Sequence, residues 1–115
     1  MTAVFQVKTN DKQEYYFHFV DDAGELLLLS AEYPEKSELE KVIADVRVGS
    51  LMGNQIAAGR TKAGEKFFVI KDASGQIIAK STLYISQMSF DNALHCVKDN
   101  ACVAEVVDRT ADVVH

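Results

Sequence analysis

His95 and Cys96 are the first residues whose types could do chemistry, as the base and the nucleophile of a covalent mechanism. They are neighbours, however, and adjacent side chains on a helix project about 100° apart, so they cannot activate each other. Neither His18 nor His115 lies at a spacing that would serve Cys96. The sequence therefore predicts no catalytic residue, and Cys96 is expected to be a small, half-buried packing residue.

The sequence also lacks the residue spacings that usually bind metals and cofactors. No paired cysteine and histidine pattern for zinc is present. The DDAGE stretch (21–25) is too short for a calcium loop and has no later glutamate at the right distance. The glycine-rich stretch at 49–59 lacks a closing Lys-Ser/Thr pair and follows a predicted helix, unlike a phosphate-binding loop. No metal ligand and no cofactor are predicted.

Two serines could act as nucleophiles, but their surroundings repeat along the chain. Ser30 lies in DDAGELLLLSAEY (21–33) and Ser81 in DASGQIIAKSTLY (72–84), each residue 51 positions from its counterpart. The same register continues without a gap from Glu14 to Leu51, which indicates an internal duplication. Because neither serine has a histidine at an equivalent place, both are predicted to be structural hydroxyls.

Each repeat is predicted to contain three strands. In the first repeat, VFQVKT (4–9) alternates apolar and polar residues, EYYFHFV (14–20) is rich in β-prone aromatic residues, and ELLLLSA (25–31) is apolar almost throughout. Gly24 and Gly75 are expected to adopt a positive φ in the turn before the third strand, where a side chain would clash.

A helix with one apolar stripe follows the strands in each repeat. The stripe consists of Leu39, Val42, Ile43 and Val46 in the first helix, and of Phe90, Ala93, Leu94 and Val97 in the second. Ser37 and Glu40 have the capping-box spacing, so the first helix is expected to begin at Ser37 and to stop at Gly49. Tyr33 and Tyr84 are expected to pack at the helix entrances, with their hydroxyl groups hydrogen-bonded there. A short β-prone piece follows each helix.

One repeat of roughly 50 residues is too small to close a hydrophobic core alone, so the two copies are expected to form one domain. The predicted fold is α+β, with tandem β-β-β-α-β repeats forming one mainly antiparallel sheet. Two helices cover one face, and the repeats are related by a pseudo-two-fold axis. The single domain of residues 1–115 divides into repeats at about 3–53 and 54–108, with a short C-terminal tail at 109–115.

The repeated pattern resembles that of the YegP-like bacterial proteins over nearly the whole chain. The residues that carry the resemblance are Tyr15, Phe17, Gly24, Leu27, Ser30, Tyr33, Lys36, Ile43 and Val46, then Phe68, Gly75, Ile78, Ser81, Tyr84, Leu94 and Val97. It implies a single sheet in which the last strand of each repeat crosses to the other, and relatives with a single repeat reach this shape as dimers. It implies no activity. The chain departs from the pattern at Val42 and Gln87.

The net charge and the distribution of apolar residues argue against two classes of protein. The formal net charge of −5 argues against nucleic acid, and no apolar stretch approaches the ~20 residues that span a membrane. The N-terminus does not read as a secretory signal, so Cys96 and Cys102 are expected to be reduced thiols and the protein to be cytoplasmic.

One feature suggests a contact surface. If Phe17 and Phe68 face the helices, then Tyr16, His18, Phe67 and Val69 face the other way, onto a side of the sheet that is normally polar. Apolar patches of this kind mark interfaces. The first hypothesis is therefore a non-catalytic interaction module that binds a protein partner or a second copy through these four residues.

The second hypothesis is a small-molecule binder or an enzyme whose site lies between the repeats. Tyr33, Tyr84 and Cys96 would be near such a site. A flat apolar patch without a deep pocket would favour the first hypothesis, whereas a cleft with convergent polar groups and shifted pKa values would favour the second.

Overall fold

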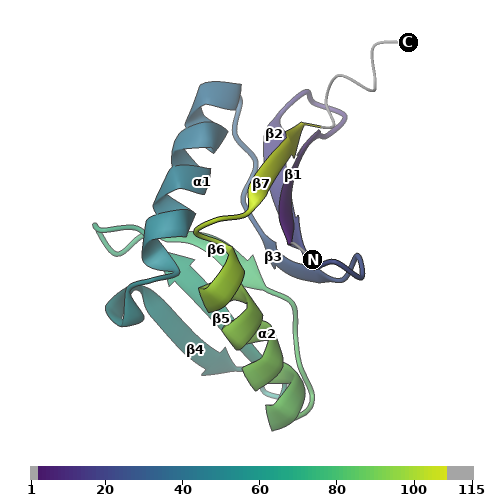
Figure 1. The fold of residues 1–115 in the computed structure, drawn as a ribbon, viewed down its shortest axis with the longest axis vertical. Helices are drawn as coiled ribbons and strands as arrows, with labels where there is room; N and C mark the ends of the chain where they lie inside the picture. The colour runs from purple at the N-terminus through teal and green to yellow at the C-terminus, as the bar shows by residue number, and fades with distance from the viewer. Residues whose placement is uncertain (1–2, 109–115) are drawn as a thin grey trace.

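The computed structural model of the chain describes residues 3–108 as one seven-stranded sheet and two long helices (Figure 1). The predicted tail, residues 109–115, lies outside this range. The elements are β1 (Val4–Thr9), β2 (Tyr15–Val20), β3 (Leu26–Leu29), α1 (Lys36–Gly49), the 3-10 helix η1 (Gly53–Gln55), β4 (Ile56–Arg60), β5 (Lys66–Lys71), β6 (Ile77–Ser81), α2 (Gln87–Asn100) and β7 (Glu105–Asp108).

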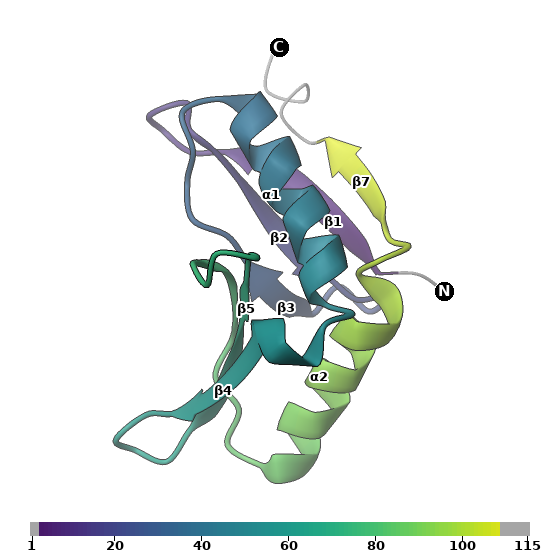
Figure 2. The same cartoon turned by 90° about the vertical axis from the view of Figure 1, so that its left-hand side faces the viewer.

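The strand order across the sheet is β4-β5-β6-β3-β2-β1-β7. All neighbouring strands are antiparallel except β1 and β7, which are parallel. Figure 2 shows both helices on the same side of this sheet. The predicted α+β fold class is confirmed, and β7 crosses from the second repeat to the first as the resemblance implied.

The sheet repeats itself in register. Phe5 pairs with Phe19 between β1 and β2, and their counterparts Ile56 and Ile70 pair between β4 and β5. The bulge between Phe19 and Val20 recurs 51 residues later in β5. The two halves meet where β3 pairs with β6, so the pseudo-two-fold axis passes between these strands. β7 has no counterpart among the strands of the structure.

The repeated serines have the structural role that the sequence predicted. The backbone N–H of Phe17 donates to Ser30 Oγ at 2.9 Å, and Ser30 Oγ donates to the carbonyl of Ala31 at 2.7 Å. In the second repeat, the N–H of Phe68 donates to Ser81 Oγ at 2.9 Å, and Ser81 Oγ donates to a backbone carbonyl at 2.8 Å. Both hydroxyls therefore satisfy buried backbone groups where the third strand leaves the ladder.

The two predicted turn glycines adopt the expected conformation. Gly24 has a φ of +86° and Gly75 a φ of +92°. The carboxylate of Asp21 stabilises the first turn by accepting the N–H groups of Ala23 and Glu25, both at 2.9 Å. Asp72 makes the equivalent hydrogen bonds in the second turn.

Replacing Gly24 or Gly75 with valine is expected to lower the free energy of unfolding by roughly 1–3 kcal/mol. No heavy atom lies within 4 Å of an added Cβ at either position, so the loss comes from backbone strain and not from a steric clash. Thermal unfolding of each variant measures it. Gly53→Val is the matched control, because Gly53 is equally open and its φ is not positive. Unfolding midpoints equal to that of the control would contradict the prediction.

The apolar stripes pack as predicted, but the start of the first helix was wrong. All four stripe residues of α1 are buried, and so are three of the four in α2, with Leu94 half-buried. α1 begins at Lys36 with Glu35 as its N-cap, and no side chain caps it. In α2, Ser86 accepts the N–H of Ser89 at 3.1 Å.

The helix start is set by a backbone contact and not by Ser37. Tyr33 and Tyr15 exchange two backbone hydrogen bonds at 2.6 and 2.8 Å, and Tyr84 and Lys66 do the same at 2.7 and 2.8 Å. The N-cap follows two residues after the tyrosine in both repeats, at Glu35 and at Ser86. Tertiary pairing therefore overrides the local capping-box spacing.

Candidate functional site

The four residues of the predicted contact surface lie on two separated strands. Tyr16 and His18 are on β2, whereas Phe67 and Val69 are on β5, and β3 and β6 lie between these strands. All four alternate with fully buried aromatic or aliphatic residues, which places them on the side of the sheet away from the helices, here called the helix-free face. Val69 is buried and the other three are half-buried.

Lysines interrupt the helix-free face. Lys8 Nζ lies 3.4 Å from His18 Nδ1, and the His18 ring is 5.2 Å from that of Tyr16. Burial, followed by the charge of Lys8, lowers the pKa of His18. Lys80, which is exposed, pairs with Val69 between β6 and β5. The aromatic side chains on this face are therefore two small groups with cations beside them.

A cavity lies between the two repeats. It has a volume of about 580 Å³ and is here called the inter-repeat cleft. The turn between β2 and β3 forms one wall and α2 forms the other. The polar side chains that line it include Asp21 and Glu25 from the first repeat and Tyr84, Ser89, Asn92 and Cys96 from the second. Leu27 and Ala93 add apolar surface. Both repeats are needed to build the cleft.

The Tyr84 hydroxyl is the unusual group in the inter-repeat cleft. It is buried, and no group in residues 3–108 lies within hydrogen-bond geometry of it. Its ring instead packs against Phe68 and Phe90. Burial is the main cause that raises the pKa of Tyr84; the neighbouring Thr82 side chain opposes this rise, and the carboxylates of Glu25 and Asp21 add to it. A buried hydroxyl without a partner is costly, which favours a ligand that supplies one.

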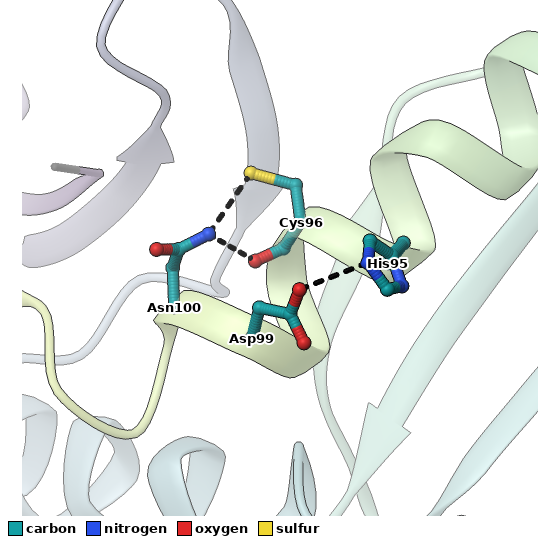
Figure 3. Close-up of polar contacts among 4 residues, drawn as sticks. All are labelled: His95, Cys96, Asp99 and Asn100. Atoms are coloured by element: carbon teal, nitrogen blue, oxygen red, sulfur yellow. Dashed lines mark hydrogen bonds and ion pairs between the residues drawn. The ribbon is translucent and has the colours of Figure 1, made fainter. Parts of the chain in front are cut away.

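Cys96 lines the inter-repeat cleft but is not an activated nucleophile. Asn100 Nδ2 donates to the Cys96 carbonyl at 2.8 Å and lies 3.5 Å from its sulfur, whereas His95 turns away to pair with Asp99 at 2.9 Å (Figure 3). Burial raises the pKa of the Cys96 thiol, and nearby carboxylates including Asp21 add to the effect. The thiol is therefore protonated at neutral pH, as the sequence reasoning expected of a packing residue.

The charge of the inter-repeat cleft is negative. Asp21 and Glu25 both line it, and no lysine or arginine among residues 3–108 does. Asp21 uses one carboxylate oxygen for the turn, while the Glu25 carboxylate is on an exposed side chain at the rim. The cleft thus presents carboxylates, hydroxyls and an amide to its interior. This set of groups suits a cation that also donates hydrogen bonds.

The first repeat does not reproduce the lining of the cleft. Lys41 occupies the position equivalent to Asn92, and Val42 the position equivalent to Ala93. Tyr33, which the sequence reasoning placed near the site, does not line the inter-repeat cleft, whereas Tyr84 and Cys96 do. Asn92 and the two carboxylates were missed. The sequence did contain a signal for Asn92, because this neutral residue replaces the charged lysine that the first repeat has at the equivalent position.

Within residues 3–108, no three potential metal ligands gather into a group that could hold an ion. None of the helices there is both long and apolar enough to cross a membrane.

Comparisons with known proteins place similar sequences in several bacteria. The family model described as a domain of unknown function (DUF1508) matches residues 61–108. A UPF0339 protein of Acinetobacter baylyi is 29% identical over 110 residues, covering 96% of this chain and 99% of that protein. The UPF0339 protein YegP of Yersinia pestis is 27% identical over 106 residues, covering 92% of this chain and 95% of its own.

Two solution NMR structures share the fold. The yegP protein of E. coli, described as of unknown function, has a TM-score of 0.88 and 29% identity, covering 96% of this chain and 95% of the other. A UPF0339 protein of Shewanella oneidensis has a TM-score of 0.93 and 26% identity, covering 100% and 98%. The similarity therefore extends over both repeats.

Proposed function

This chain belongs to the UPF0339 (YegP) family, and we propose that it binds a small, positively charged molecule in the inter-repeat cleft. The observation that carries the proposal is the cleft itself, which joins two carboxylates and a hydroxyl and which, within residues 3–108, contains neither a lysine or arginine nor a hydrogen-bond partner for that hydroxyl. Its volume of about 580 Å³ is typical of small-molecule sites.

A protonated amine fits these groups best. An ammonium group donates up to three hydrogen bonds, and those to carboxylates are stronger because the acceptor is charged. The carboxylates of Asp21 and Glu25 would form ion pairs with the ammonium group, and the Tyr84 oxygen would accept a further hydrogen bond. The apolar surface of Leu27 and Ala93 would contact a short hydrocarbon chain. A small alkylamine or diamine combines all of these features.

Binding is a better reading than catalysis. The Cys96 thiol has a raised pKa, and His95 turns away from it to pair with Asp99. No histidine therefore activates the Cys96 thiol for nucleophilic attack. The two free cysteines support a reducing compartment such as the cytoplasm.

The Asn92→Lys variant tests this proposal. Lysine is the residue that the first repeat carries at this position, so the fold is expected to accept it. The new ammonium would occupy the cleft and repel a cation, and we expect amine binding to weaken at least about tenfold. Binding of 1,5-diaminopentane is measured by NMR titration, with neutral 1,5-pentanediol as the matched probe.

The control is Asn54→Lys, which adds the same charge at an exposed asparagine outside the inter-repeat cleft. It should leave diamine binding unchanged. The proposal is overturned if the diamine gives no shifts at cleft residues, if the diol binds equally well, or if both lysine variants weaken binding alike.

The helix-free face is a second candidate, as a contact surface for a protein partner. The observation in its favour is that Tyr16 and Phe67 remain half-buried aromatic residues on a face without helices. The Tyr16→Lys/Phe67→Lys double variant should keep its circular dichroism spectrum yet lose captured protein in lysate pull-downs, because interface aromatics contribute roughly 1–2 kcal/mol or more each. Leu83→Lys/Ile85→Lys, at exposed apolar residues elsewhere, is the control. Equal capture by the two double variants would rule out this candidate.

A further inference from the structure

A second, smaller cavity lies at the end of the sheet, between β4 and the start of α2. It has a volume of about 290 Å³ and is here called the edge cavity. The residues that line it are Ala58, Gly59, Arg60, Lys66, Gln87 and Phe90. It shares none of these residues with the inter-repeat cleft, so the two are separate sites.

The edge cavity is positively charged. Arg60 and Lys66, which pair between β4 and β5, both line it, and no carboxylate among residues 3–108 does. Lys66 Nζ donates to Gln87 Oε1, and Gln87 Nε2 donates to Asp91 at 2.8 Å, just outside the cavity. Arg60 is exposed and makes no ion pair within the described part of the chain. This set of groups suits an incoming carboxylate.

The strand beside the edge cavity is open. β4 is the last strand of the sheet, and nothing in residues 3–108 pairs with its outer side (Figure 1). Such an edge presents unpaired backbone N–H and C=O groups that can accept a further strand. Backbone pairing and a charged pocket are therefore available side by side.

The equivalent place in the first repeat is closed by β7. Val7, the counterpart of Ala58, is 1% exposed, whereas Ala58 is an exposed residue. Asp108 of β7 lies opposite Val7, and its carboxylate pairs with Lys36, the first residue of α1. The counterpart of Lys36 is Gln87, which lines the edge cavity. In the first repeat, this space is thus filled by an extended strand that carries a carboxylate.

We propose that the outer edge of β4 binds an extended acidic segment of a partner protein, with one carboxylate of that segment in the edge cavity. The segment pairs in parallel with β4, as β7 pairs with β1. By the 51-residue repeat its carboxylate lies opposite Ala58, where Arg60 and Lys66 bind it.

NMR titration with the peptide acetyl-AEVVD-amide tests the inference. Its sequence is that of residues 104–108, which cover the first repeat. We expect a dissociation constant of about 1 mM, since the segment is short. Backbone amides of Ile56–Arg60 and of the first turn of α2 should shift, and the β4 amides that do not pair with β5 should exchange more slowly. Acetyl-AEVVN-amide, which lacks the last carboxylate, should bind at least about tenfold more weakly.

The Arg60→Glu variant tests the charge of the edge cavity. Arg60 is exposed, so the fold is expected to accept the substitution, and binding of acetyl-AEVVD-amide should weaken at least about tenfold. The matched control is Lys62→Glu, which makes the same change of charge at an exposed residue of the turn after β4, outside the cavity. It should leave binding unchanged.

Several results would overturn the inference. Equal binding of the two peptides, or equal losses in Arg60→Glu and Lys62→Glu, would show that no carboxylate is bound in the edge cavity. Sodium acetate that reproduces the shifts at the same concentration would show that the cavity takes a free carboxylate without a strand. Shifts in β1 and not in β4 would mean that the peptide exchanges with β7. An absence of shifts at about ten times the expected dissociation constant would mean that the edge binds no strand.

Discussion

Replacing Ser30 and Ser81 together with alanine is expected to lower the free energy of unfolding by about 2–6 kcal/mol, a large share of the stability of a small domain. Each hydroxyl accepts a buried backbone N–H at 2.9 Å, from Phe17 and Phe68 respectively. Alanine leaves that N–H unsatisfied, which costs about 1–3 kcal/mol per site. The two sites are in different repeats and share no partner, so their effects should add.

Urea unfolding of the two single variants and the double variant measures this loss. Ser37→Ala is the control, because Ser37 is exposed and does not cap α1. Each single variant should lose about half of what the double variant loses. A double variant as stable as the control would mean that water or another group replaces the serine hydroxyls.

Replacing Gly49 with valine is expected to destabilise the domain by about 3 kcal/mol, the upper end of the usual cost of overpacking a core. Gly49 is buried at the end of α1, where a Cβ would lie 2.8 Å from Ile70 Cγ2 and 3.1 Å from the carbonyl of Lys71. Because Gly49 has only a hydrogen as its side chain, α1 of the first repeat can pack closely against β5 of the second. The second repeat has Asn100 at the equivalent position, so this close approach occurs once.

Thermal unfolding compares Gly49→Val with Ala44→Val, a substitution at an exposed position of the same helix. The control measures the modest loss of helix propensity that valine causes, which is a few tenths of a kcal/mol. Similar midpoints for the two variants would show that β5 moves away from α1 without loss of stability.

The fold could be predicted because the duplication constrains it twice. The first three strands of each repeat, the turns between them and the serine were visible in two copies, and Gly24 with Gly75 identified the same turn independently. The start of α1 could not be predicted from Ser37, because the backbone contact between Tyr15 and Tyr33 sets it from a distant strand. The close approach at Gly49 depends equally on tertiary packing.

The candidate site was only partly predictable for the same reason. Tyr84 and Cys96 were placed near the junction of the repeats, and both line the inter-repeat cleft. Asp21 was assigned to a turn, which is correct, and Glu25 to the start of the third strand, which begins one residue later at Leu26. Only the three-dimensional structure brings both residues against α2. The local sequence pattern predicts that a turn forms, but it does not predict which helix that turn will contact.

The parallel pair of β1 and β7 has a consequence for synthesis. Val4 pairs with Glu105, so β1 must wait for almost the entire described chain before its outer neighbour exists. At ribosomal rates of about 5–20 residues per second, that interval lasts roughly 5–20 s. The first repeat also waits for β6 to cover its other edge at β3. On a polysome, the first repeats of neighbouring nascent chains therefore have two open strand edges. The second repeat of each chain covers these edges once it is made, and so keeps the first repeats apart.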